Sequence, residues 1–247
     1  MKFSKVKRIQ FVSLLILSIS LSFEGNASDI YGAVVNNSER LKSDFAHDEK
    51  RKPLDILPFT QIKEGDKVLE LGAGGGYTTE LLSLLVGKSG KVYAHFLYKK
   101  ERLENNRLPN VISLREHSLN EHAQVLAENE IQSNKLDAII IFFVLHDIYL
   151  NNEMSDELLS SLKAALKPGG SVIILDNAAK PDSGLANIGD LHRIGEKFVK
   201  AEMEKAGFVF DGETAVLRNK QDDHTKPWGD FEGLQDRFAY RFKKGRM

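Results

Sequence analysis

Short apolar runs alternate with amphipathic segments along most of the chain. The runs Lys67–Leu71, Ala138–Leu145 and Ser171–Leu175 are apolar almost throughout, which is typical of strands buried on both faces of a sheet. Between such runs lie segments like Thr78–Val86, in which the leucines recur on one helical face. Because strands and helices alternate from Lys67 onward, the pattern predicts an α/β fold with a mostly parallel, doubly wound sheet.

Residues that end or cap helices lie between these segments and set the predicted boundaries. Glycine or proline follows several helical segments, and Ser155 is a suitable N-cap for the helix that begins after it. Pro53 and Pro58 are expected to interrupt the helical stretches of residues 29–60. The predicted strands are Lys67–Leu71, Lys91–Phe96, Asn110–Leu114, Ala138–Leu145, Ser171–Leu175 and two less buried ones, Val209–Leu217 and Arg237–Phe242; the predicted helices are Thr78–Val86, Lys100–Asn106, Glu121–Glu128, Ser155–Leu166 and Glu196–Ala206.

The first residues have the layout of a secretory signal peptide. Four cations in residues 2–8 precede the apolar run Phe11–Ser22, which is shorter than the roughly 20 residues of a membrane-spanning helix. The small residues Gly25 and Ala27 follow at the place where cleavage is expected. We therefore expect residues 1–27 to be removed and the protein to be exported, to the periplasm. The alternative is an uncleaved N-terminal segment that anchors the protein to a membrane or lies buried.

Composition excludes several classes of protein. The 34 Lys and Arg against 35 Asp and Glu give a net charge of −1, which argues against a nucleic-acid binder that neutralises phosphates. The chain has no cysteine, so disulfides, thiolate metal sites and cysteine nucleophiles are excluded.

A glycine-rich turn follows the strand Lys67–Leu71 at once and leads into the next helix. Its pattern is Glu70, then Gly72, Gly74 and Gly76 at every second position. Glycine lets a ligand approach the backbone closely, and the helix start offers unpaired amides. The dinucleotide fingerprint fits poorly because Tyr77 stands where its third glycine would be, and no Lys-Ser/Thr pair makes a P-loop.

This E-x-G-x-G-x-G turn resembles the first motif of class I S-adenosylmethionine-dependent methyltransferases. Leu166–Gly170 (LKPGG) resembles the family signature before the fifth strand, and Asp137 opens an apolar strand ending in Val144–Asp147 (VLHD), like the family's fourth strand and following loop. The resemblance implies a Rossmann-like, mostly parallel seven-stranded sheet with an antiparallel C-terminal strand, and S-adenosyl-L-methionine as cofactor. It assigns residues 61–247 to the methyltransferase domain.

The chain is more narrowly similar to a group of predicted, often exported methyltransferases. Stretches like Asp48–Pro53 and Leu191–Ile194 are shared with that group. Residues 28–60 then form an N-terminal helical segment that could fold over the site as a lid, as could the long polar stretch Arg218–Gln235. The alternative for Asp48–Lys52 is a solvated charged helix, and the alternative for Arg218–Gln235 is a disordered surface excursion.

The resemblance also implies a set of cofactor contacts. The family usually ends its second strand with Asp or Glu, which binds the ribose hydroxyls, whereas this strand ends in His95 and Phe96. His95 can make one hydrogen bond there, Phe96 can pack on adenine, and Glu116 can contact adenine from beyond the third strand. The expected cofactor-binding residues are Glu70, Gly72, Ala73, Gly74, Gly75, Gly76, Tyr77, His95, Phe96, Glu116 and Val144.

Methyl transfer from a sulfonium needs alignment and, for an oxygen or nitrogen acceptor, a base. His146, Asp147 and Asp176 follow the fourth and fifth strands, and His192 lies in the next loop-to-helix region. We expect these four side chains to converge, with His192 as the base and Asp147 or Asp176 orienting it. His146, Asp147 and His192 could in principle ligate a metal together with Asp176, but no metal is expected, since no fixed metal-binding spacing such as H-E-x-x-H occurs.

Two other functions compete with an active methyltransferase. The missing ribose carboxylate favours a non-catalytic module that binds an adenosyl ligand and kept the fold. A short-chain nicotinamide oxidoreductase needs Tyr-x-x-x-Lys, which the chain lacks. The expected partner is a small-molecule substrate, with no nucleic acid and no stable membrane insertion after cleavage; the methyl acceptor and the oligomeric state stay open.

Overall fold

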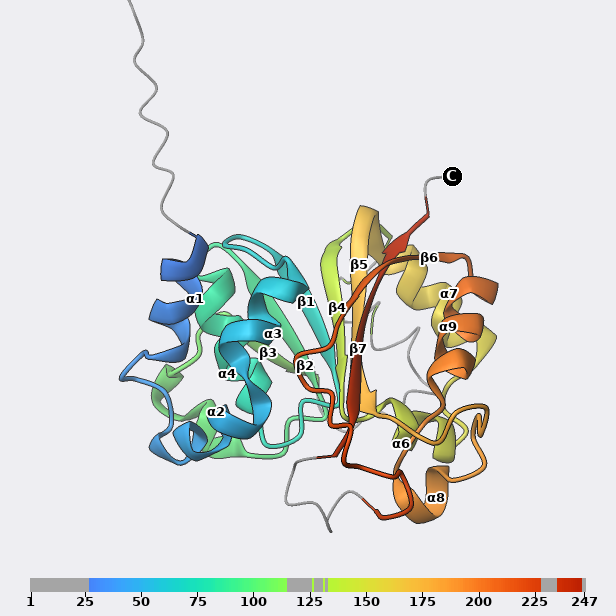
Figure 1. The fold of residues 1–247 in the computed structure, drawn as a ribbon. Helices are drawn as coiled ribbons and strands as arrows, with labels where there is room; N and C mark the ends of the chain where they lie inside the picture. Colours follow the sequence, from blue (N-terminus) through green and yellow to red (C-terminus); the bar gives the residue numbers. More distant parts are fainter. Residues whose placement is uncertain (1–26, 115–125, 127–130, 132, 228–234, 246–247) are drawn as a thin grey trace, which may run out of the picture.

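The computed structural model describes residues 27–114, 126, 131, 133–227 and 235–245. One sheet runs through the middle of the molecule, with helices on both of its faces (Figure 1). The N-terminal helices lie on one face and the helices of the C-terminal half lie on the other (Figure 1). This arrangement is the doubly wound α/β fold that the alternation of segments predicts.

The sheet has seven strands in the order β3-β2-β1-β4-β5-β7-β6. The first five strands pair in parallel, whereas β7 is antiparallel to both β5 and β6. The seven-stranded sheet with its antiparallel C-terminal strand is thereby confirmed. The strands are β1 (Lys67–Leu71), β2 (Lys91–His95), β3 (Val111–Leu114), β4 (Leu136–Phe142), β5 (Leu166–Asn177), β6 (Phe208–Thr214) and β7 (Arg237–Lys244).

Two apolar cores, one on each face of the sheet, explain why the central strands are apolar throughout. In β4, Ala138 and Ile140 belong to the core under α1, α3 and α4, while Ile139 and Ile141 belong to the core under α6, α7 and α9. The helices are α1 (Ala27–Val35), α2 (Phe45–Arg51), α3 (Pro53–Thr60), α4 (Tyr77–Val86), α6 (Leu145–Leu150), α7 (Asp156–Ala165), α8 (Ile188–Leu191) and α9 (Glu196–Lys205), with short 3-10 turns at Lys42–Asp44, Lys100–Arg102 and Glu104–Asn106.

Several predicted boundaries agree with the structure and others need correction. Ser155 caps α7, because its hydroxyl accepts a hydrogen bond of 3.1 Å from the Leu158 amide. The strand predicted to reach Leu145 ends at Phe142, since Phe143 is left-handed with a φ of 58° and α6 starts at Leu145. Pro58 does not interrupt a helix but lies within α3.

Two further expectations differ from the structure, and a third falls mostly outside the described residues. Residues 100–106 form two 3-10 turns instead of one helix, with Asn105 in the left-handed region at a φ of 52°. The last strand is well buried instead of less buried, because β7 lies between β5 and β6. The predicted helix Glu121–Glu128, apart from Leu126, lies outside the described residues. None of the helices in the described ranges is long and apolar enough to cross a membrane.

Candidate active site

The glycine-rich turn has the backbone conformation that its glycines allow. Gly72, Gly74 and Gly76 are all left-handed, with φ values of 70°, 55° and 76°. Three amides of the turn donate to protein carbonyls: Ala73 to His95 at 2.8 Å, Gly74 to Phe96 at 3.1 Å, and Gly76 to Ala73 at 2.8 Å. These bonds fix the shape of the turn and keep those three amides from a ligand.

The turn lies directly against the end of β4. A Cβ atom added to Gly72 would lie 2.6 Å from Cγ2 of Val144, so this position requires glycine both for its φ and for the close approach. Val144 therefore lies beside the glycine turn, as its assignment to the cofactor site requires. Since the residues after Val144 start α6, the turn and the segment that carries His146 are neighbours.

A buried arginine, Arg102, contacts the glycine turn, and the sequence pattern did not reveal this contact. Arg102 is 1% exposed and donates to both carboxylate oxygens of Asp44, at 2.7 and 2.9 Å. It also donates to Glu80 of α4 at 2.5 Å and to the carbonyl of Gly75. Arg102 thus joins the glycine turn, α4 and the N-terminal segment. Its surroundings in the sequence are polar, so no local pattern distinguishes it from a surface arginine.

Glu70 has its partner inside the protein. Its carboxylate is buried and accepts a hydrogen bond of 2.6 Å from the Thr79 hydroxyl of α4. Burial raises the pKa of Glu70 to about 7, although the Thr79 bond and the charges of Arg102 and Arg51 act in the opposite direction. The carboxylate therefore links β1 to α4, and its contact with the cofactor stays a prediction.

Two exposed aromatic side chains border the glycine turn at the end of β2. Phe96 is 56% exposed and left-handed, with a φ of 61°, and Tyr98 is 63% exposed. The Tyr98 amide donates to the Gly74 carbonyl at 3.1 Å, which holds this segment against the turn. His95, in contrast, is buried. An aromatic face suited to stacking on a flat base is therefore present, whereas residues 91–98 include no acid. Glu116 lies outside the described residues.

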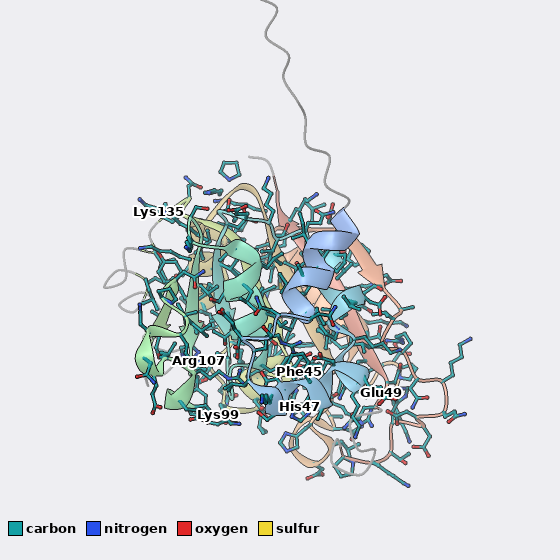
Figure 2. The ribbon with its side chains drawn as sticks, turned by 90° about the vertical axis from the view of Figure 1, so that its left-hand side faces the viewer. Phe45, His47, Glu49, Lys99, Arg107 and Lys135 are labelled. Atoms are coloured by element: carbon teal, nitrogen blue, oxygen red, sulfur yellow. The ribbon has the colours of Figure 1, made fainter. Side chains whose placement is uncertain are left out.

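The N-terminal segment is docked on the start of α4. The Tyr77 hydroxyl donates to Asp48 of α2 at 2.6 Å, and Arg40 donates to both oxygens of the same carboxylate at 2.9 and 2.8 Å. Burial and the Asp48 carboxylate raise the pKa of Tyr77. The side chains Phe45, His47 and Glu49 of α2 lie at the same end of the molecule as Lys99, which follows β2 (Figure 2).

An apolar pocket lies between this segment and the end of β4. The guanidinium of Arg51 is 4.7 Å from the Tyr77 ring centroid and 5.4 Å from that of Phe143, and the guanidinium of Arg237 is 4.7 Å from the Phe143 ring centroid. Sequence reasoning placed Arg51 in the lid region and missed Arg237. The pocket lining includes Arg51, Ile56, Tyr77, Phe142, Phe143 and Leu175.

The four predicted catalytic side chains converge beyond the carboxyl ends of β4 and β5. His146 Nδ1 is 2.7 Å from Asp176 Oδ1, and the His146 amide donates to the other oxygen of that carboxylate at 2.9 Å. His192 Nδ1 is 3.2 Å from Asp147 Oδ1, and the two imidazole centroids are 5.4 Å apart. Asp147 is thus the partner of His192, while Asp176 is the partner of His146.

Charge and burial differ within this group. Asp176 is completely buried, whereas the side chains of Asp147 and His192 are 40% and 35% exposed. Burial alone would lower the pKa of His146, but the hydrogen bond and the charge of Asp176 outweigh it and raise that pKa. The group therefore has an enclosed half and a half that an acceptor can reach.

Known proteins identify the family. A family model described as "Methyltransferase domain" matches residues 45–211, which is more than half of the chain. The chain belongs to this methyltransferase family. The model spans the glycine turn, the pocket and the four converging side chains.

Solved structures of other proteins share the fold. A SAM-dependent methyltransferase from Aquifex aeolicus is 22% identical, with 83% of this chain and 96% of that chain covered and a TM-score of 0.59. The YcgJ protein from Bacillus subtilis is 11% identical, with 78% and 97% covered and a TM-score of 0.52. Identities this low show a common fold and leave the acceptor open.

Curated relatives match only in short stretches. A protein-L-isoaspartate O-methyltransferase from Fervidobacterium nodosum is 51% identical over 38 residues, 15% of this chain and 19% of that protein. A probable cobalt-precorrin-6B C(15)-methyltransferase from Saccharolobus solfataricus is 49% identical over 49 residues, 20% and 24% of the two chains. The chain thus spans a quarter or less of the length of these relatives.

Proposed function

We propose that this chain transfers the methyl group of S-adenosylmethionine to a small-molecule acceptor bound between α2 and the carboxyl ends of β4 and β5. The observation that carries the proposal is the contact between Gly72 and Val144, in a chain of the methyltransferase family. It brings the glycine turn of the donor site next to the segment that bears His146 and Asp147. A donor on the turn and an acceptor over that segment are then neighbours.

The residues present suit the cofactor in part. The left-handed glycine turn can take the ribose and the amino-acid portion, and Phe96 offers an aromatic face to adenine. When bound, the cofactor supplies a methyl group that is already activated on sulfur. The chain itself has to align the acceptor, exclude water and accept a proton.

Asp147 and His192 are the more exposed members of the four converging side chains, and they provide the acceptor for that proton. The Asp147 carboxylate holds the imidazole of His192 through Nδ1, which leaves Nε2 of that ring to accept a proton from the acceptor. The completely buried Asp176 fixes His146 in place beside it. Residues 28–60, docked through Tyr77 and Asp48, cover the site against water.

Calorimetry with S-adenosylmethionine and S-adenosylhomocysteine on the purified chain tests the donor site. We expect both to bind, and Phe96→Ala to weaken binding because a base-stacking face is worth about 1–3 kcal/mol. Val209→Ala is the matched control, since Val209 is equally exposed at 56% but lies on β6, across the sheet from β2. Absence of binding by the wild-type chain would refute the proposal.

A non-catalytic adenosyl-binding module is the second candidate. It is favoured by the missing acid at the end of β2, where His95 and Phe96 stand in its place. Binding of S-adenosylhomocysteine without methyl release from S-adenosylmethionine, across a panel of oxygen, nitrogen and sulfur acceptors, would support this candidate against the enzyme.

We further propose that the protein is exported and cleaved after Ala27. The basic start, the apolar run Phe11–Ser22 and the small residues Gly25 and Ala27 support this. N-terminal sequencing of the protein recovered from the periplasm is expected to begin at Ser28. An intact Met1, in protein that sediments with membranes, would favour the uncleaved anchor instead.

A further inference from the structure

We propose that His146, Asp147 and His192 bind a divalent first-row transition-metal cation. The three ligand atoms, His146 Nε2, Asp147 Oδ1 and His192 Nδ1, lie within 4.8 Å of one another. Two imidazoles and one carboxylate are a donor set suited to Zn²⁺, Fe²⁺, Mn²⁺ or Co²⁺. We call these three residues the His–Asp–His cluster.

The spacing within the cluster suits a shared cation as well as hydrogen bonds. Asp147 Oδ1 is 3.2 Å from His192 Nδ1 and 3.4 Å from His146 Nε2. Charge-assisted hydrogen bonds are shorter, about 2.7–2.9 Å. Two atoms that bind one cation at about 2.1 Å lie about 3.0 Å apart at a right angle and about 3.4 Å apart at the tetrahedral angle.

The contact between His146 and Asp176 is shorter than the two contacts of Asp147. His146 Nδ1 and Asp176 Oδ1 are 2.7 Å apart, which is a hydrogen-bond distance. The imidazole of His146 thus makes a short contact through Nδ1 and a longer one, of 3.4 Å, through Nε2. One ligand atom from each of the three residues lies within 4.8 Å of the other two, so a cation placed among them is within reach of all three.

Asp176 prepares His146 to be a ligand. The carboxylate occupies Nδ1 of the ring and also accepts from the His146 backbone amide, so the ring orientation is set from two sides. Nε2 then points toward Asp147. A carboxylate behind a histidine is the arrangement that orients metal-bound imidazoles and raises their basicity.

The cluster is closed on one side and accessible on the other. The His146 side chain is 5% exposed, whereas those of Asp147 and His192 are 40% and 35% exposed. Three protein ligands leave coordination positions for water or a substrate oxygen. The cation's role toward the acceptor rests on the proposed function: the acceptor would then be a molecule with a metal-binding oxygen. With a cation present, His192 is a ligand, and the cation would lower the pKa of the coordinated acceptor hydroxyl, whose proton then leaves to water before the methyl group is transferred.

Metal titrations of the chelator-treated full chain test the cluster. We expect one equivalent of ZnCl₂ or MnCl₂ to bind in calorimetry, and CoCl₂ to give a visible absorption band. His192→Ala and Asp147→Asn should each lose at least about 10-fold in affinity, and Asp176→Asn about 10- to 100-fold. Circular dichroism melting of each variant confirms that it folds.

His224→Ala is the matched control. His224 forms a separate histidine–carboxylate pair, with Nε2 3.1 Å from Asp236 Oδ2, outside the His–Asp–His cluster. Its loss should leave the metal affinity unchanged. The proposal is overturned if the wild type binds none of the three ions, or if folded His192→Ala and Asp147→Asn bind them as the wild type does.

S-adenosylhomocysteine binding, measured in EDTA, separates this inference from the proposed function. Metal-free wild type and His192→Ala should bind it equally, because the glycine turn and Phe96 do not depend on the cation. If the chain binds S-adenosylhomocysteine but no metal, only the proposal of a cation site is refuted. If it binds metal at the cluster but no S-adenosylhomocysteine, the methyltransferase proposal is refuted instead.

Discussion

At the residue scale, Glu70 is both the first residue of the glycine motif and a buried residue of the protein interior. It opens the glycine pattern by which the family resemblance was found, yet its carboxylate is buried against Thr79. Burial of an ionised carboxyl group is costly, which is why the pKa is raised to about 7. The residue is therefore a source of pH-dependent stability as well as a marker of the site.

Glu70→Gln is expected to change how stability depends on pH. Because the pKa of Glu70 is about 7 in the folded chain and near 4.5 when unfolded, the folded chain holds more protons between these values. The free energy of unfolding should fall as pH rises through that window, by roughly 3 kcal/mol from this group. Urea unfolding at pH 5 and pH 8 measures it. Identical pH dependence in both proteins would contradict the assignment.

Arg102 makes a second prediction at this scale. Arg102→Met leaves Asp44 and part of Glu80 buried without their cation, and should cost about 3–5 kcal/mol of stability. Lys197→Met, which breaks the exposed pair with Asp182, should leave the stability almost unchanged. Urea unfolding midpoints of the two variants test the contrast. A similar small effect in both would mean that Arg102 is not a structural centre.

At the element scale, the sequence predicts what depends on local pattern. The strands from Lys67 onward follow from apolar runs, and α7 follows from its N-cap and helical periodicity. The end of β4 could not be predicted, because the run continues through Val144 and Leu145 while the chain turns at Phe143. An apolar pattern indicates burial, and Leu145 and Ile148 of α6 are buried although the strand has already ended at Phe142.

The candidate site likewise has a part that the local sequence pattern predicts and a part that it does not. The glycine turn and the four converging side chains follow from their positions after successive strands. The bidentate Arg102–Asp44 pair and Arg237 beside Phe143 join residues that are far apart in the chain. No local sequence pattern predicts such contacts, since each of these charged residues alone is typical of a protein surface.

Ser155→Ala tests the local part of this argument. Loss of the hydroxyl leaves the Leu158 amide without its cap and should lower stability by about 1 kcal/mol. Ser155→Asp, another good N-cap, should retain most of the stability. Ser161→Ala, in the same helix α7 but away from its start, should be neutral or slightly stabilising. Equal losses in Ser155→Ala and Ser161→Ala would show that the cap contributes nothing.

At the scale of the whole molecule, the chain gathers its chemistry at one edge of the sheet. The glycine turn follows β1, the exposed aromatics follow β2, His146 and Asp147 follow β4, Asp176 lies at the carboxyl end of β5, and His192 follows it. The N-terminal segment completes this edge, although it precedes every strand in the sequence. Polar contacts attach it at several places, among them the hydrogen bond from Tyr77 to Asp48 and the bidentate pair of Arg102 with Asp44.

Asp48→Ala should loosen this segment without unfolding the sheet. The variant removes the acceptor of the Tyr77 hydroxyl and leaves the buried Arg40 without its carboxylate. Hydrogen exchange of the α2 amides, among them the Lys52 amide that donates to the Asp48 carbonyl, should become faster. Amides of α9, on the other face of the sheet, should exchange as in the wild type.

Binding of S-adenosylhomocysteine should slow exchange in α2 of the wild type and do so less in Asp48→Ala, because closure over the site depends on the same contacts. Asp182→Ala, which breaks only an exposed pair with Lys197, controls for the loss of a carboxylate. If Asp48→Ala accelerates exchange equally in α2 and α9, the contacts support the entire domain. The N-terminal segment would then be a structural part of the fold, and the lid role would have to be given up.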